Sequence, residues 1–242
     1  MLVVDTGDRW RFITQPDHAH LSGRLAALWR TDGLAEHPRR DDILFAAREH
    51  DNGWREIDAA PRWNARDRRP HDFMSLPMEE RNEVWRRGVD RYLDERPYAA
   101  RLICRHALTL YESQRDDPDS EDLMDFLDAR EEELAEATGV PTQDVQRDYA
   151  WITATDRFSL AVLLGWSEPR TQRFWDHTLE MAVDEAGTLR LDPFPLAGST
   201  TFQVPVRHID PRDYGGDAAL SLALATARFE TWKIRVAAPA GR

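Results

Sequence analysis

Lysine and cysteine are almost absent from this 242-residue chain. Lys233 is the only lysine, so arginine supplies the other 31 of the 32 basic residues. Cys104 is the only cysteine, which excludes a disulfide within the chain and favours a reducing compartment. The longest apolar runs fall well short of the roughly 20 residues that a membrane-spanning helix needs, and no charged-then-apolar leader opens the chain. We therefore expect a soluble cytoplasmic protein with no membrane partner.

Positive charge is also in deficit. The chain has 44 acidic and 32 basic residues, a net charge of −12. This balance argues against binding to nucleic acid duplexes, which requires basic surface to meet phosphate. It still permits a small anionic substrate held by a local group of arginines. The hydrophobic fraction of 41% and the nine tryptophans indicate a folded chain with a sizeable core. The oligomeric state is left open, with a dimer as one option.

Local patterns predict strands at both ends of the chain and helices between them. A hairpin is expected from strands at 2–4 and 10–13. Apolar periodicity predicts helices over about 16–30, 41–53, 77–95, 97–114, 120–138 and 143–164. Gly53 is expected to end the second helix in a left-handed conformation. The residues from 55 to 77 predict a long polar connection.

After residue 178 the long helical patterns give way to short apolar runs separated by glycine and proline. Strands are expected over 179–183, 189–191, 201–209 and 228–236. The segment 218–227 is ambiguous between helix and strand, and we favour a strand. These patterns predict a single domain, 1–242, in the mainly α class. It would consist of a hairpin over 1–14, a helical core over 15–178 and a β-rich extension over 179–242. The strands of both termini are expected at the periphery, in one shared antiparallel sheet.

The adjacent pair His50-Asp51 is the centre of the candidate site. His18, His106 and Asp156 lie on three other predicted helices. Imidazole nitrogen and carboxylate oxygen suit a divalent metal ion such as Mn, Fe, Zn, Ni or Mg. Helices of a bundle can project such ligands inward to one point. Each histidine taken alone is more often structural, so the prediction depends on whether these side chains converge.

The order of these residues resembles the HD-domain superfamily of metal-dependent phosphohydrolases, in which His, His-Asp and Asp follow one another on a helical core. The chain is more closely similar to an uncharacterised family, domain of unknown function 3891, over about residues 2 to 236. The segments that carry this likeness are Gln15-Pro16-Asp17-His18, Glu49-His50-Asp51-Asn52-Gly53-Trp54, Arg69-Pro70-His71-Asp72-Phe73, Pro97-Tyr98-Ala99-Ala100, Arg105-His106 and Thr155-Asp156-Arg157-Phe158-Ser159-Leu160. The superfamily resemblance implies an HD-like helical bundle core, with an N-terminal hairpin and C-terminal antiparallel strands around it.

The same resemblance implies that His18, His50, Asp51 and Asp156 bind the principal metal. His106 would then bind a second ion or contact phosphate. Members with two metals carry more closely placed histidines than this chain offers, which favours one metal.

Three further side chains are candidates for catalysis. Arg105 and Arg157 neighbour proposed ligands and could grip phosphate or carboxylate, or else pair with the abundant acids. Asp58 could orient a ligand histidine or act as a general base, or cap a loop. The leading hypothesis is a metal-dependent hydrolase acting on a small anionic substrate, a phosphoester or nucleotide. The alternatives are a di-iron oxygenase and a non-catalytic binding or scaffold protein, for which Asp156 would pair with an arginine.

Overall fold

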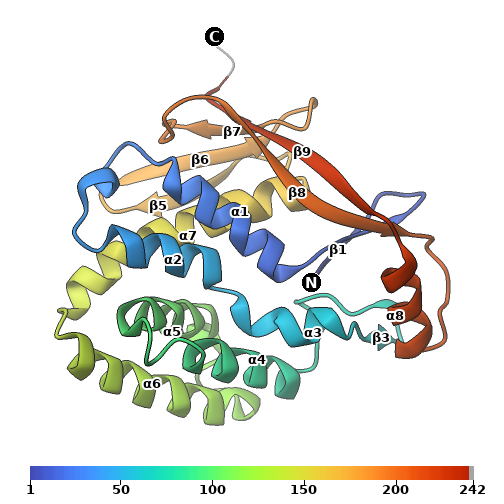
Figure 1. Cartoon of the computed structure of the whole chain (residues 1–242), viewed down its shortest axis with the longest axis horizontal. Helices are drawn as coiled ribbons and strands as arrows, with labels where there is room; N and C mark the ends of the chain where they lie inside the picture. The colour runs from blue at the N-terminus through green and yellow to red at the C-terminus, as the bar shows by residue number, and fades with distance from the viewer. Residues whose placement is uncertain (240–242) are drawn as a thin grey trace.

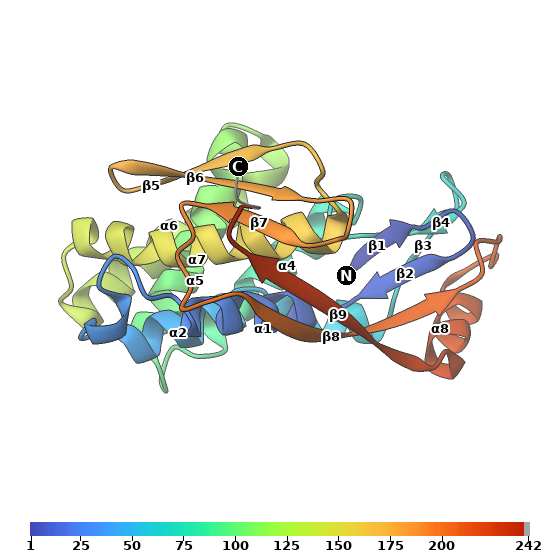
Figure 2. The ribbon, with the colours of Figure 1, turned by 90° about the horizontal axis from the view of Figure 1, so that it is seen from above.

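Seven strands from both ends of the chain form one curled sheet that covers a layer of helices (Figures 1 and 2). This computed structural model describes residues 1–239. The strands, in their order across the sheet, are β1 Leu2–Asp5, β2 Trp10–Ile13, β8 Thr200–Ile209, β9 Phe229–Ala237, β7 Leu189–Asp192, β6 His177–Val183 and β5 Arg170–Phe174.

The amino-terminal hairpin joins the carboxy-terminal strands within this sheet. Trp10 of β2 lies opposite Ile209 of β8, and the long pair β8 and β9 continues the sheet. The prediction that strands of both termini share a sheet is therefore confirmed. The prediction that this sheet is wholly antiparallel is wrong, because β7 and β9 run parallel.

The helices form close to the positions expected from apolar periodicity. Thr14 caps the first helix by accepting a hydrogen bond from the backbone N–H of Asp17, and Pro16 lies in its first turn. Gly139 and Gly165 end two other helices with φ values of 62° and 69°. The helices are α1 Gln15–Ala27, α2 Arg40–Glu49, α3 Arg55–Ala59, α4 Met78–Asp90, α5 Pro97–Tyr111, α6 Pro118–Thr138, α7 Thr142–Leu164 and α8 Asp217–Thr226. Three short 3-10 turns, η1 Leu34–Glu36, η2 Asn52–Trp54 and η3 Glu112–Gln114, complete the helical part. Over the described residues, none of these helices has both the length and the apolar character needed to cross a membrane.

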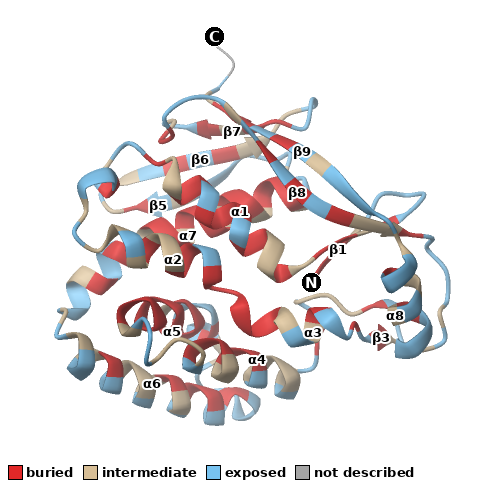
Figure 3. Cartoon of the chain, in the orientation of Figure 1, coloured by how far each residue is buried: buried red, intermediate tan, exposed pale blue. Residues whose placement is uncertain are grey.

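The main core extends from the sheet through helices α1 and α7 to α2, α4, α5 and α6, as the buried faces in Figure 3 indicate. Phe202, Val204 and Val206 alternate along β8 and point one buried face at these helices. Trp29, after α1, stacks on Phe158 of α7 at a centroid separation of 6.0 Å. The sheet therefore contributes one wall of the core.

This architecture corrects the predicted fold class. The chain is not a mainly α, HD-like bundle with strands at its periphery; it is an α+β fold with a mixed seven-stranded sheet. The physical reason is that β6, β7, β8 and β9 bury their apolar faces in the same core as α1 and α7. Strand β5 was not predicted, since only Phe174 of its five residues is buried.

Two segments differ from the sequence-based expectation in a smaller way. The segment 218–227 forms helix α8, so the predicted strand is wrong. Its leucines at 220, 222 and 224 suggest a period of two, but Leu220 and Leu224 are buried one turn apart while Leu222 is 66% exposed. The predicted connection 55–77 contains α3 and a small two-stranded sheet, β3 Trp63–Asn64 and β4 Arg69–Pro70.

Candidate metal centre

The His50-Asp51 pair lies where α2 passes into η2. The helix ends at Glu49, and His50 still has helical backbone angles, while Asp51 has φ −105° and ψ 20°. The expected left-handed stop at Gly53 is not present. Instead, a Cβ atom on Gly53 would lie 2.0 Å from the carbonyl oxygen of Val84, so only glycine lets η2 pack this closely on α4. This backbone contact positions the segment that carries the His-Asp pair.

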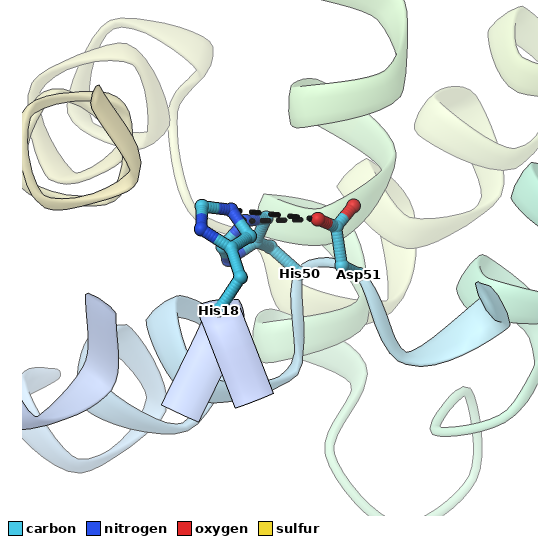
Figure 4. A group of neighbouring side chains, drawn as sticks. All are labelled: His18, His50 and Asp51. Atoms are coloured by element: carbon cyan, nitrogen blue, oxygen red, sulfur yellow. Dashed lines mark hydrogen bonds and ion pairs between the residues drawn. The ribbon is translucent and has the colours of Figure 1, made fainter. Parts of the chain in front are cut away.

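The ligand atoms of four predicted residues converge from α1, α7 and the end of α2. His18 Nε2 lies 3.0 Å from Asp156 Oδ1, 3.3 Å from His50 Nε2 and 3.6 Å from Asp51 Oδ2. His50 Nε2 lies 3.5 Å from both carboxylates. Figure 4 shows how the His18 and His50 rings face the Asp51 carboxylate.

These separations fit the spacing of ligands around one divalent ion. Two ligand atoms, each about 2.1 Å from an ion and about 90–110° apart, are separated by about 3.0–3.4 Å. His106 is the fifth member of this group of candidate ligands. Its ligand nitrogen lies within 4.8 Å of the ligand nitrogen of His50 and of a carboxylate oxygen of Asp156. All five residues are buried, as required of a centre shielded from bulk water.

Hydrogen bonds on the far side of each ring fix the orientation of the three imidazoles. Nδ1 of His50 lies 2.9 Å from the carbonyl oxygen of Ala47, which can only accept a hydrogen bond, so Nδ1 carries the proton and donates. Nδ1 of His18 lies 2.7 Å from the Ser159 hydroxyl. Because that hydroxyl donates to the carbonyl oxygen of Asp156, it accepts from His18. Both Nε2 lone pairs are then directed at the shared centre, the arrangement found around bound metals.

His106 is held in a similar way, by a tyrosine. Its Nδ1 lies 3.0 Å from the hydroxyl of Tyr149, which is seven residues before Asp156 and on the same face of α7. Neither Tyr149 nor Ser159 was predicted as a site residue. Their positions carry a signal, however, since residues three or seven positions from Asp156 share its face of a helix.

The charges of the cluster are strongly coupled. Burial acts to lower the pKa of His50, but the carboxylates of Asp51 and Asp156 outweigh it and raise that pKa to about 9. Burial acts to raise the pKa of Asp156, yet hydrogen bonds from His18 and His50 hold it well below its ordinary value. Burial and the neighbouring His50 lower the pKa of His106 to about 3. The two carboxylates thus require positive charge beside them, which a protonated imidazole or a divalent cation can supply.

Two overlapping groups of three residues have ligand atoms close enough together to hold one metal ion each. They are His18, His50 and Asp51, and His50, His106 and Asp156. Both contain His50, whose Nδ1 is engaged by Ala47, so only Nε2 remains as a ligand. One nitrogen lone pair binds one ion. The set as a whole is therefore best matched by a single metal.

A cavity of about 70 Å³ adjoins the cluster. Its polar lining includes Gln15 and Trp54, and neither Gln15 Oε1 nor Trp54 Nε1 has a hydrogen-bond partner among the described residues. Leu110, which is 47% exposed, marks the side nearest to solvent. The full lining is Gln15, His18, Asp51, Trp54, Phe73, Trp85, His106, Leu110, Asp156 and Leu160.

The three predicted catalytic residues lie outside this lining. Asp58 is buried, and its carboxylate accepts from the backbone N–H of Gln15 at 2.6 Å and from the Met1 amino group at 2.5 Å. Asp58 does not line the cavity itself, but it binds the backbone of Gln15, whose side chain does. Arg105 and Arg157 are half-buried and form no ion pair within residues 1–239, so the predicted pairing with acids is not observed. Asp156 contacts His18 and His50 in place of the arginine expected of a scaffold protein.

Comparison with known proteins gives one match. The model of a family described as "Protein of unknown function (DUF3891)" matches residues 1–211, most of the chain. No curated protein matches the chain. No solved structure matches it either.

Proposed function

This chain belongs to the DUF3891 family, and we propose that it is a metal-dependent hydrolase acting on a small anionic substrate, a phosphoester or nucleotide. The observation that carries the proposal is the convergence of His18, His50, Asp51 and Asp156 at separations of 3.0–3.6 Å. Such a ligand set occurs in hydrolases because a divalent ion activates water and polarises a phosphoryl or carbonyl oxygen.

The cavity beside the cluster supports a reaction on one small group. At about 10–15 Å³ for each water, its 70 Å³ corresponds to about five to seven waters, enough for an ion, a water and a phosphoryl-sized group. The rest of a larger substrate would extend past Leu110 towards solvent. Gln15 Oε1 can accept a hydrogen bond and Trp54 Nε1 can donate one, so both can orient the group inside.

The chain's own residues then have distinct proposed roles. His18, His50, Asp51 and Asp156 hold the ion, with His106 as a further ligand or a contact to the substrate. Arg105 and Arg157, free of carboxylate partners in the described part of the chain, remain available to the substrate's negative charge. Asp58 orients Gln15 by accepting from its backbone N–H.

Metal content and activity test the proposal together. We would measure bound metals by mass spectrometry, then hydrolysis of a panel of phosphomonoesters, phosphodiesters and nucleotides with each candidate metal. His50→Gln and Asp156→Asn should lose metal and activity by at least about 100-fold while keeping their circular dichroism spectrum. His177→Gln, a half-buried histidine of β6 outside the cluster, is the matched control and should behave as the wild type.

The outcome separates the three hypotheses. No metal binding at micromolar concentration would exclude the hydrolase and leave a binding or scaffold protein. Two irons per chain together with oxygen consumption would favour the di-iron oxygenase. One metal per chain with hydrolysis that depends on His50 and Asp156 would support the proposal.

A further inference from the structure

A second pocket, of about 380 Å³, lies on the other side of Tyr149 from the metal centre. It is lined by residues of α5, α7 and β5 and by the turn after β5. Its size falls within the range of about 300–1,000 Å³ that is usual for small-molecule sites. Tyr149 is buried, lines this pocket and places its hydroxyl 3.0 Å from His106 Nδ1. The pocket and the metal centre are therefore separate but share one side chain.

Two arginines without carboxylate partners line this pocket. Across residues 1–239, neither Arg147 nor Arg173 forms an ion pair, and no carboxylate is part of the lining. The neighbouring Asp176 is exposed and contacts His177 at 3.3 Å; this contact, and more weakly the charge of Arg147, lowers the pKa of Asp176. The lining therefore carries two guanidinium groups and no carboxylate that could neutralise them.

The two guanidinium groups are held in place by one tryptophan. The Arg147 guanidinium lies 4.8 Å from the centroid of the Trp175 ring, and the Trp175 indole donates to the backbone oxygen of Arg147. Arg173 Nε donates to the backbone oxygen of Trp175 at 3.2 Å. Trp175 has a φ of 50°, an uncommon conformation for a bulky residue, which these contacts hold. Guanidinium groups that are fixed in this way lose little freedom when they bind an anion.

Other polar groups extend the pocket in the same direction. Thr109, Gln146 and Gln172 supply hydroxyl and amide groups to the lining.

The two larger hollows beside α1 provide the contrast. They also contain arginines, Arg24 and Arg48, but the carboxylates of Asp17 and Glu49 line one and that of Asp41 lines the other. An anion entering either hollow would meet like charge. The lining of the pocket beside Tyr149 contains arginine side chains and no carboxylate.

We propose that the pocket formed by α5, α7 and the β5–β6 turn is a binding site for a small organic anion, separate from the metal centre. Its phosphate or carboxylate would bind Arg147 and Arg173, and its organic part would lie against Tyr149 and Ala150. The proposal does not depend on the hydrolase activity.

Calorimetric titration with phenylphosphonate and with benzoate tests the site, because neither probe can be hydrolysed. We expect saturable binding below millimolar concentration that weakens as salt is added. The probe that binds more tightly identifies phosphate or carboxylate as the preferred group. Arg147→Gln and Arg173→Gln should each weaken binding at least tenfold. Arg147→Lys should bind more tightly than Arg147→Gln but less tightly than the wild type, because lysine keeps the positive charge but cannot donate two parallel hydrogen bonds as guanidinium does.

Arg212→Gln is the matched control, because Arg212 also lies over an aromatic ring, that of Tyr214 at 4.9 Å, but far from the pocket. It should bind both probes as the wild type does. The proposal is overturned if neither probe binds saturably, or if Arg147→Gln and Arg173→Gln bind as tightly as the control. Binding retained in both pocket variants would assign the anion to another site, including the metal centre.

Discussion

The hydroxyl of Ser159 lies 2.7 Å from Nδ1 of His18, and it connects the first and last helices of the candidate metal centre. Ser159 is on α7, one turn after Asp156, and His18 is in the first turn of α1. The contact fixes the His18 tautomer and directs Nε2 towards Asp156. Two residues 141 positions apart thus determine the orientation of one candidate ligand.

Ser159→Ala should weaken metal binding without unfolding the chain. Loss of a hydrogen bond that orients a ligand typically costs about 10–100-fold in metal affinity. Isothermal titration with Zn²⁺ or Mn²⁺ measures this change. Ser120→Ala is the control, because Ser120 is also fully buried but its hydroxyl has no partner in the described structure. Equal metal affinity in both variants would contradict the orienting role of Ser159.

Gly53→Ala should destabilise the fold and the site together. Its Cβ would meet the Val84 carbonyl oxygen at 2.0 Å, so α4 and η2 must separate, at a cost of about 3 kcal/mol. Denaturant unfolding measures the loss of stability, and metal titration should show weaker binding because His50 and Asp51 shift with η2.

Gly198→Ala is the matched control for this effect. A Cβ at Gly198 meets nothing within 4 Å, so its free energy of unfolding should stay within about 0.5 kcal/mol of the wild type. Similar stability of the two variants would show that the close approach of η2 to α4 is not required.

Helix α8 can be tested by its leucines. Leu220→Ala removes a buried side chain and should cost about 2–5 kcal/mol, whereas Leu222→Ala changes an exposed one and should cost under about 0.5 kcal/mol. Denaturant titration of both variants measures the difference. A strand would expose or bury Leu220 and Leu222 alike, and equal losses would then be observed.

His37 should make stability depend on pH. Burial lowers its pKa, an effect that the nearby Asp148 opposes, so the folded chain binds this proton less tightly than the unfolded chain does. As pH falls below about 6.5, His37 is therefore protonated at a higher pH in the unfolded chain than in the folded chain. The free energy of unfolding decreases as the pH is lowered. Comparing unfolding free energies at pH 7 and pH 5 should show a smaller decrease for His37→Gln than for the wild type. An identical decrease in both proteins would contradict this assignment.

Much of the candidate site was accessible from the sequence because ligand chemistry is carried by residue type. His50 and Asp51 are adjacent, and the predicted helices carried His18, His106 and Asp156, all five of which the structure brings together. Asp58, Arg105 and Arg157 were chosen by their proximity in the chain to those residues. Proximity in the chain does not determine which way a side chain points, and all three lie outside the cavity lining.

The fold was less accessible for a related reason. Helix α7 is visible as a 3.6-residue apolar period, because that pattern is local to one segment. Strand pairing is not local: β2 bonds to β8 across nearly 200 residues, and β7 pairs in parallel with β9 although β8 and α8 separate the two strands in the chain. Residue types and periodicity thus specified the helices other than α3 and α8, and the candidate ligands. The mixed sheet, the orientation of the three imidazoles and the arginine pocket beside Tyr149 depend on long-range packing, which sets the direction of each side chain.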